Sequence, residues 1–229
     1  MFSYYGSKSK IVNLYPPPKF DKIIEPFAGS ARYSLKYWQK DVLLVDKYEI
    51  IVKVWQWLQK CSKNDIAGLP SVKRGDNVTE LNINDEAKWL MGFCINRGSI
   101  APKNIVADFC NWDEDKKRII SYLDKIKHWT IQVGTYDEIP NFPDVTWFID
   151  PPYKNGGEYY KFSSKELDFE HLGKWCMERT GQTIVCENTK ADWLPFKPMA
   201  KLTGQAQTTT EAIWSNLKTN YDDVQMGLF

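Results

Sequence analysis

Apolar segments that alternate with helical segments constrain the fold of this chain more than any other feature. Between residues 21 and 38, an apolar strand ends at Glu25 and leads through a turn into a helix. Residues 41–45 (DVLLV) form a second apolar strand, and the helical segment 48–60 follows it. Two strand–helix units in succession predict an α/β fold with a mixed, mostly parallel sheet and helices on both faces.

The pattern changes between residues 59 and 128. Two helical segments are expected there, with polar loops between them. One begins at Asn82 or Asn84, which are suitable N-caps, and the other covers residues 113–129. We therefore interpret residues 59–128 as a small helical insertion.

Strand patterns resume after the insertion, and a helical segment at 165–181 interrupts them. The later strands are expected at 129–133, 145–150, 182–187 and 209–216. Because these strands would continue the sheet begun before the insertion, residues 1–58 and 129–229 are expected to form one main domain.

The composition is typical of a globular protein and argues against a membrane-spanning, secreted, disulfide-rich or metal-binding protein. The 229 residues are 43% apolar and 26% charged, enough for one sizeable α/β domain. The apolar runs are shorter than the roughly 18 residues of a membrane span, and the first ten residues lack the apolar core of a secretory signal, so a cytoplasmic protein without a membrane partner is expected. Five cysteines without a CxxC pair indicate neither disulfides nor a metal site. A net charge of +1 means that any nucleic-acid surface is local.

The tetrapeptide DPPY, Asp150 to Tyr153, directly follows the apolar segment 145–149. In open α/β sheets, ligands bind beyond the carboxyl ends of the strands, where this motif would lie. The exocyclic amine of a nucleobase is a poor nucleophile, and the Asp150 carboxylate and Pro151 carbonyl could hold its two N–H groups in an attacking geometry. Pro151 and Pro152 restrict φ and preorganise that carbonyl, while Tyr153 could stack on the base. The alternative is a proline turn begun by an aspartate.

The segment EPFAGS, Glu25 to Ser30, and Asp46 have the positions of a nucleotide site. Gly29 permits close approach of a ligand, and the helix start beyond it offers N–H groups to a carboxylate. Asp46 ends the second strand, where nucleotide-binding folds place an acid that accepts both ribose hydroxyls. The lack of GxGxxG argues against NAD or FAD. An ordinary strand–helix turn and a lone surface aspartate are the alternatives.

Taken together, these motifs resemble the Dam-like class of DNA adenine-N6 methyltransferases over nearly the whole chain. The matching segments are YYGSK (4–8), EPFAGS (25–30), VDKYE (45–49), VGTYDEIP (133–140), IDPPY (149–153) and EAIWSN (211–216). The last of these resembles the final strand of the family and is expected at the edge of the sheet. The resemblance implies a Rossmann-like S-adenosylmethionine-dependent methyltransferase fold, S-adenosylmethionine as cofactor, and methyl transfer to adenine N6 in double-stranded DNA, as in restriction-modification systems.

The resemblance also implies individual roles. Asp46 would hold the ribose, and Asp150 would contact both the methionine part of the cofactor and the target amine. Thr135 replaces an aspartate that is common in the family, and Ser7 replaces a glycine, which weakens the match at these two positions. The residues that would bind the cofactor are Tyr4, Lys8, Glu25, Phe27, Gly29, Asp46, Thr135, Tyr136 and Asp150.

The insertion is expected to contact DNA. Asn96 and Arg97 resemble the start of the DNA-contacting loop of the family, but GSIAPKNIVADF (98–109) replaces its aromatic, asparagine-rich continuation. Base-reading residues and a recognition sequence are therefore not transferred. For Arg97, a solvated or capping arginine is the alternative to a DNA contact. The candidates for DNA contact are Lys73, Arg74, Arg97 and Lys103.

Two alternative functions stay open at this point. Cytosine-N4 methylation poses the same electronic problem, and a non-catalytic DNA-binding protein could retain the methyltransferase fold with a shortened recognition loop. None of these functions needs a metal, and a monomer or weak dimer is expected. His128 and His171 lack a serine or cysteine neighbour for a catalytic triad, so they are interpreted as surface or structural residues.

Overall fold

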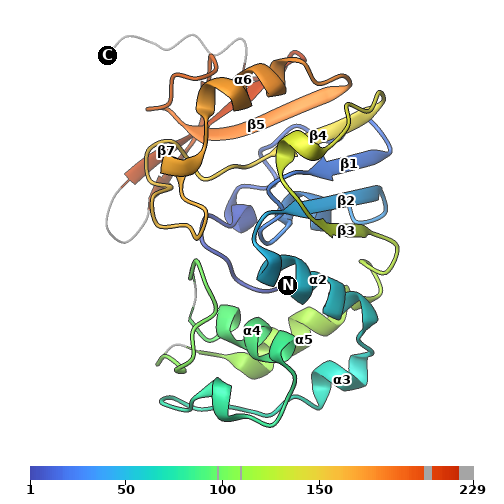
Figure 1. Ribbon diagram of the computed structural model, residues 1–229, viewed down its shortest axis with the longest axis vertical. Helices are drawn as coiled ribbons and strands as arrows, with labels where there is room; N and C mark the ends of the chain where they lie inside the picture. The colour runs from blue at the N-terminus through green and yellow to red at the C-terminus, as the bar shows by residue number, and fades with distance from the viewer. Residues whose placement is uncertain (97, 109, 204–207, 222–229) are drawn as a thin grey trace.

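The computed structural model describes residues 1–96, 98–108, 110–203 and 208–221, and Figure 1 shows their arrangement. The strands are β1 (Lys22–Glu25), β2 (Asp41–Asp46), β3 (Thr130–Val133), β4 (Val145–Ile149), β5 (Gln182–Asn188), β6 (Lys197–Thr203) and β7 (Thr208–Ser215). The α-helices are α1 (Arg32–Lys36), α2 (Glu49–Lys60), α3 (Lys63–Ala67), α4 (Asp85–Cys94), α5 (Trp112–Leu123) and α6 (Phe169–Met177). Short 3-10 helices are η1 (Lys8–Lys10), η2 (Val78–Glu80), η3 (Tyr136–Glu138) and η4 (Ser164–Glu166). Within the described ranges, no helix combines the length and the apolar character needed to cross a bilayer.

The seven strands form one mixed sheet in the order β3-β2-β1-β4-β5-β7-β6. Strands β1 to β5 are parallel, and β7 is antiparallel to both of its neighbours. The chain order reverses between β1 and β4, so a topological switch point lies there. The expected mixed, mostly parallel α/β sheet is confirmed.

The expectation that EAIWSN forms the edge of the sheet is wrong. This segment lies in β7, which is an inner strand between β5 and β6. The edge strand is β6, which was not predicted from the sequence. β6 carries Lys197, Pro198 and Lys201, and its pairing with β7 is irregular between Pro198 and Ala200. Proline and lysine are disfavoured in central strands but tolerated at an edge, so this segment lacks the apolar alternation by which strands are recognised.

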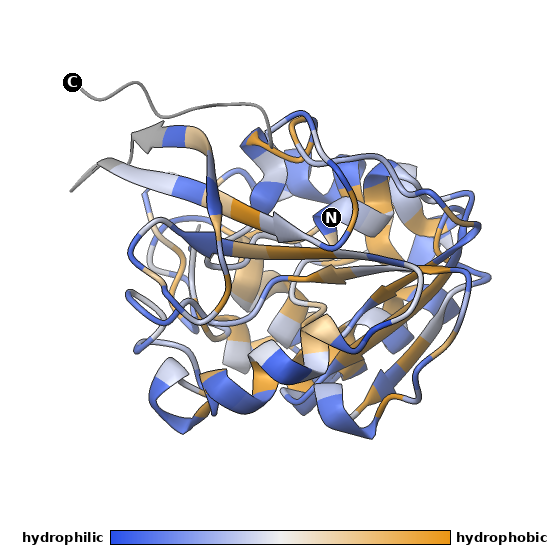
Figure 2. Ribbon diagram, turned by 90° about the horizontal axis from the view of Figure 1, so that it is seen from above, coloured by the Kyte–Doolittle hydropathy of each residue, from blue (hydrophilic) through white to orange (hydrophobic). Residues whose placement is uncertain are grey.

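Helices cover both faces of the sheet. Val42 and Leu44 of β2 join a buried cluster with α2, whereas Leu43 and Val45 join a second cluster on the opposite face with α6. Burial on both faces explains why β2 is an uninterrupted apolar run rather than an alternating one. Figure 2 shows the apolar segments gathered in the sheet and on the helix faces turned toward it.

Residues 59–128 contain the helices α3, α4 and α5; α4 and α5 correspond to the two expected helical segments, and α3 was not expected. Of the two possible N-caps, Asn84 begins α4, and its Oδ1 accepts a backbone N–H in the first turn at 3.0 Å. Helix α5 ends at Leu123 rather than continuing to residue 129. The Gln59 side chain donates to the backbone carbonyls of Ile126 at 2.9 Å and Trp129 at 2.7 Å, which holds the chain in a turn toward β3.

The helices of the insertion share a core with the rest of the chain. Figure 1 shows α3, α4 and α5 together beyond α2, on the side away from β5 and β6. Phe93 of α4 stacks on Phe2 at a ring separation of 5.4 Å, and Phe2 also contacts Trp55 of α2 at 5.3 Å. One hydrophobic cluster therefore extends from the sheet into the insertion. The division into a main domain and a separate insertion stays a prediction.

Candidate active site

A cavity of about 440 Å³ opens at the carboxyl ends of β1, β2 and β4. All nine residues expected to bind a cofactor line this cavity, although they come from separate parts of the chain. Of the DPPY motif, Asp150 and Pro152 line it, whereas the buried Pro151 and the half-buried Tyr153 do not. The fold thus brings the candidate cofactor residues together, and the role of each stays a prediction.

Asp46 joins the loops that follow β1 and β2. Its Oδ2 accepts the Gly29 N–H at 2.9 Å, and its Oδ1 accepts the Tyr48 N–H at 2.8 Å. Burial raises the pKa of Asp46 to about 6, and the two backbone hydrogen bonds oppose this rise. The carboxyl is therefore mostly ionised at neutral pH, and each oxygen has a lone pair for a further donor.

Gly29 adopts a backbone conformation that suits glycine. Its φ is +43°, and a Cβ at this position would lie 3.2 Å from the ring of Tyr4. The preceding Ala28 N–H donates to the Val45 carbonyl at 3.0 Å, so the loop lies directly against the end of β2. The helix after this loop, α1, has only five residues, so its N-terminus supplies a smaller dipole than the sequence suggested.

Glu25, the last residue of β1, forms an uncharged part of the cavity wall at neutral pH. The residue is 2% exposed, and its Oε1 accepts the Ser34 N–H at 2.8 Å. Burial raises the pKa of Glu25 to about 8, although the hydrogen bonds from Ser34 oppose the rise. Glu25 is therefore mostly protonated near pH 7, and it can ionise if a cation approaches.

An aromatic surface lies beside the end of β3. The rings of Phe27 and Tyr136 stack with a centroid separation of 5.6 Å and an interplanar angle of 26°. The Tyr136 hydroxyl forms a hydrogen bond with Nδ1 of His171 at 2.7 Å. Burial raises the pKa of Tyr136 to about 12, so the hydroxyl stays protonated. Thr135 precedes this group, and its N–H donates to Glu138 Oε2 at 2.7 Å.

Asp150 follows β4 and forms an ion pair with Lys8. Lys8 Nζ lies 2.7 Å from Asp150 Oδ1, and it also donates to the Gly6 carbonyl at 3.2 Å. Burial raises the pKa of Asp150 to about 6; the Lys8 ammonium lowers it, and the charge of Glu211 raises it further. Above that pH, Asp150 is a carboxylate whose Oδ1 is held by Lys8 and whose Oδ2 can accept a donor in the cavity.

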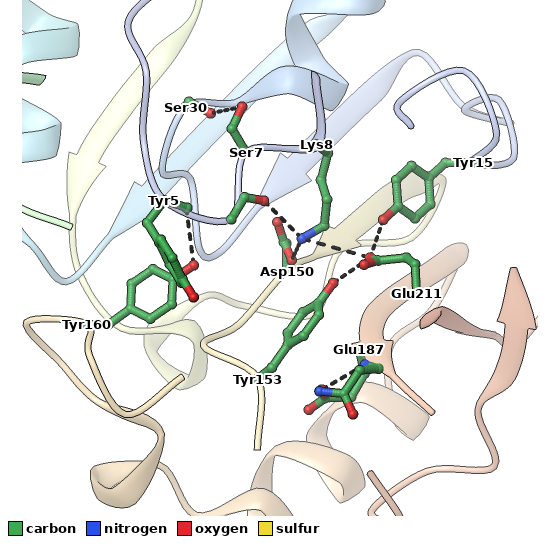
Figure 3. A network of polar contacts seen from close by, with 12 residues as sticks. Tyr5, Ser7, Lys8, Tyr15, Ser30, Asp150, Tyr153, Tyr160, Glu187 and Glu211 are labelled. Carbon is green, nitrogen blue, oxygen red and sulfur yellow. Dashed lines mark hydrogen bonds and ion pairs between the residues drawn. The ribbon is translucent and has the colours of Figure 1, made fainter. Parts of the chain in front are cut away.

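A buried network lies behind Asp150, and Figure 3 shows its members. The hydroxyls of Tyr153 and Tyr15 both donate to Glu211 Oε1, the second at 2.5 Å. Lys8 Nζ lies 3.8 Å from the same oxygen and 4.6 Å from the centre of the Tyr153 ring. The Tyr153 ring thus packs beside Lys8 rather than against the cavity. The expected stacking of Tyr153 on a base stays a prediction.

Tyr160 and the segment that carries Gly6 form one wall of the cavity. The Tyr160 hydroxyl donates to the Tyr5 carbonyl at 3.1 Å, and the ring of Tyr160 lies 5.9 Å from that of Tyr4. Gly6 has a φ of +72°, and a Cβ there would lie 2.3 Å from the Tyr160 oxygen. A glycine is therefore required for the segment to pass so close to Tyr160.

Three of the four residues expected to contact DNA are described, and Arg97 lies outside the described residues. Lys73, Arg74 and Lys103 are exposed and belong to two adjoining loops, which are joined by hydrogen bonds between Gly75 N–H and the Val106 carbonyl and between Val78 N–H and the Asn104 carbonyl. The Arg74 guanidinium pairs with the exposed Asp108 carboxylate. None of the three lines the cavity.

Several residues of this region are not evident from the sequence. Glu211, Tyr15 and Tyr160 were not singled out, and His171 was expected only at the surface or in a structural role, whereas its exposed ring lines the cavity. Glu211 had a weak signal, because it lies inside an expected strand and a charged residue requires partners wherever such a strand is buried. The other three had none, since their contacts link segments far apart in the sequence.

Among the described residues, the cysteines and acidic side chains form no metal site. The five cysteines form no disulfide in the described structure, and Cys61, Cys94, Cys176 and Cys186 are buried. In the part of the chain that the structure describes, no group of histidine, cysteine, aspartate and glutamate side chains could hold a metal ion.

Comparisons with known proteins give little guidance. No family model matches the chain, and no curated protein sequence matches it. Among solved structures, the chain is similar to a Haemophilus influenzae protein described as a "putative methylase", with 9% identity and a TM-score of 0.38 over 86% of this chain and 87% of the other. At this level of similarity, the function has to be argued from the site itself.

Proposed function

We propose that this protein is an S-adenosylmethionine-dependent methyltransferase that methylates the exocyclic N6 of adenine in DNA. The observation that carries the proposal is the position of Asp150. It follows β4 at the switch point of the sheet, in the same cavity as the acid, glycine and aromatic residues expected of a nucleoside site. The Rossmann-like methyltransferase fold belongs to this proposal, and the observed strand order is compatible with it.

The cavity suits the cofactor in size and in the chemistry of its walls. Its volume of about 440 Å³ lies within the range of small-molecule sites, roughly 300 to 1,000 Å³. Asp46 would accept the ribose hydroxyls, and the Phe27–Tyr136 surface would pack against the adenine ring. Glu25 and Asp150 are acidic groups suited to the methionine ammonium, and the glycine conformation at Gly29 lets the ligand approach the backbone. When bound, the cofactor would supply an electrophilic methyl group.

The residues around Asp150 would prepare the amine for methylation. Asp150 Oδ2 and the Pro151 carbonyl would accept the two N–H groups of the target amine, which directs the nitrogen lone pair toward the methyl group. Asp150 would stabilise the positive charge that develops on the amine nitrogen as it takes the methyl group, and the electron pair of the broken S–C bond would stay on the cofactor sulfur. One N–H proton would then leave the methylated nitrogen for solvent, which restores a neutral amine. Pro151 and Pro152 keep the carbonyl in place because their φ angles are restricted.

The insertion would contribute the DNA contacts. Lys73, Arg74 and Lys103 are exposed cations on adjoining loops, and such residues bind phosphates without reading sequence. The Arg74–Asp108 pair is exposed, and pairs of this kind contribute little to stability, so Arg74 could exchange Asp108 for a phosphate. Double-stranded DNA bound to a monomer or weak dimer is the proposed assembly.

The test is methylation by purified protein with labelled S-adenosylmethionine and mixed-sequence duplex DNA, followed by digestion and mass spectrometry of the nucleosides. N6-methyladenine is the expected product. N4-methylcytosine would overturn the adenine assignment but keep amine methylation. Cofactor binding without any methylated nucleoside would reject the proposed substrate, and a protein that does not bind the cofactor would be a non-catalytic DNA-binding protein or another class of enzyme.

Asp150→Asn and Asp150→Ala test the role of the carboxylate. Each should lower kcat by about 100- to 1,000-fold, because an acceptor used in the transition state is removed. Asp192→Asn is the matched control, since Asp192 pairs with Lys154 at the surface and does not line the cavity. Turnover of Asp150→Asn within a factor of three of the control would refute the mechanism.

A further inference from the structure

Glu211 is a buried acid that the proposed reaction does not use directly. It lies in β7 with 3% of its surface exposed. Both tyrosine hydroxyls of the network donate to one of its oxygens, Oε1, and Lys8 Nζ is 3.8 Å from the same atom. Burying a carboxylate costs free energy unless its oxygens receive hydrogen bonds or an ion pair. For Glu211, one of these partners is Lys8, the same ammonium that pairs with Asp150.

The network contains two carboxyl groups and one ammonium. Lys8 contacts Asp150 at 2.7 Å and Glu211 at 3.8 Å, so a single cation serves both acids. Burial alone lowers the pKa of Lys8, but the charges of Asp150 and Glu211 outweigh this effect and raise it, so Lys8 stays protonated. The sharing of Lys8 limits how strongly it can neutralise Asp150.

We propose that Glu211 is a positioning residue for Asp150. Glu211 accepts the Tyr153 hydroxyl and shares the Lys8 ammonium, so that Lys8 neutralises Asp150 only in part and Asp150 remains a strong hydrogen-bond acceptor. This inference rests on the proposed function for its role in catalysis. The electrostatic coupling of Glu211 to Asp150 through Lys8 does not depend on which reaction the protein catalyses. Glu211 would act through Lys8 and Tyr153 and would not touch the substrate.

Other titratable groups also face Asp150, and they affect its titration in the wild type and in every variant. Glu25 of β1 and Glu187 of β5 interact electrostatically with Asp150, as do Cys186 and the hydroxyls of Tyr15, Tyr153 and Tyr160. Burial raises the pKa of each of these groups. Glu211 differs from the other two acids, Glu25 and Glu187, because it also forms an ion pair with Lys8, so a change at Glu211 should affect Asp150 in a distinct way.

The decisive variant is Glu211→Gln, which keeps a carbonyl acceptor for the two tyrosine hydroxyls but removes the charge. The Lys8 ammonium would then be directed to Asp150 alone. The titration midpoint of Asp150 should fall by about 0.5 to 1 pH unit, since a nearby negative charge has been removed. It can be followed by the ¹³Cγ chemical shift of Asp150, assigned by comparison with Asp150→Asn.

Glu211→Gln should also change the pH profile and the plateau value of kcat, with little effect on cofactor affinity. The acidic limb of the kcat profile should move to lower pH, and the plateau kcat should fall about tenfold because Asp150 becomes a weaker acceptor. The dissociation constant of the cofactor should change by less than about twofold, because Glu211 itself does not line the cavity. Tyr15→Phe removes one hydrogen bond to the same oxygen without changing any charge, so it separates an electrostatic role from a structural one.

Tyr15→Phe should lower stability in urea unfolding but leave the Asp150 midpoint in place. An unchanged Asp150 midpoint in a folded Glu211→Gln protein would overturn the proposal, and so would equal midpoint shifts in Glu211→Gln and Tyr15→Phe. A midpoint shift in Glu211→Gln alone supports the coupling even if the wild-type protein methylates no amine. In that case the proposed function fails and the link between Glu211 and Asp150 stands.

Discussion

The most quantitative prediction concerns the buried carboxyl of Glu25. This residue ends β1 with 2% of its surface exposed, and the Ser34 N–H is its hydrogen-bond donor at 2.8 Å. Burial raises its pKa from the ordinary value of 4.5 to about 8, against the opposing effect of Ser34. Replacement by glutamine keeps the carbonyl that accepts from Ser34 and removes the ability to ionise.

The sign and size of the effect follow from proton linkage. Below pH 4.5, the folded and unfolded chains both hold the Glu25 proton, and between pH 4.5 and about 8 only the folded chain holds it. The stability contributed by the neutral carboxyl is therefore lost as pH rises through the folded pKa. A rise from 4.5 to about 8 corresponds to about 5 kcal/mol in total, since one pKa unit is worth about 1.4 kcal/mol.

The assay is urea unfolding of the wild type and Glu25→Gln at several pH values between 5 and 8. The difference in unfolding free energy should grow in favour of Glu25→Gln by about 3 to 4 kcal/mol across this range. Other titrating groups are common to both proteins and cancel in the difference. Glu178→Gln, at a side chain that is 71% exposed, controls for the loss of one carboxylate. Unfolding curves that stay parallel from pH 5 to 8 would refute the reasoning.

Two further predictions concern the loops of the cavity. Asp46→Ala should weaken cofactor binding by about 1.5 to 3 kcal/mol and also destabilise the fold, because the N–H groups of Gly29 and Tyr48 lose their acceptor. Titration calorimetry that shows unchanged affinity would exclude Asp46 as the ribose ligand. Gly6→Ala should cost about 1 to 3 kcal/mol in urea unfolding, since φ is +72° and the new Cβ would lie 2.3 Å from the Tyr160 oxygen. Adding Tyr160→Phe should recover part of that loss, and a Gly6→Ala protein as stable as the wild type would contradict the described geometry.

The local elements of the fold could be predicted from the sequence because their signals are local. The apolar run of β2 and the N-cap at Asn84 are encoded within a few neighbouring residues. The edge strand β6 could not be predicted, because Pro198 and its lysine neighbours are acceptable only at the edge, and that position depends on the pairing of β7.

Much of the candidate site was also predictable. Asp46 ends β2 and Asp150 directly follows β4, and parallel strands carry such residues to the same edge of the sheet. Their common cavity therefore follows from the strand–helix order. The position of Tyr153 does not follow from it, because the direction of its ring depends on a partner, Glu211, that is 58 residues away in the chain.

The sequence by itself determined the α/β class, the order of the strands and helices other than β6 and α3, and most of the residues that meet at the carboxyl edge of the sheet. The tertiary structure alone decided which buried polar groups are paired: the Lys8 ammonium with Asp150 and Glu211, and the Tyr15 hydroxyl with Glu211 across 196 residues. The physical reason is that local periodicity and turn chemistry act over a few residues, whereas burial and pairing of charges depend on how distant segments pack.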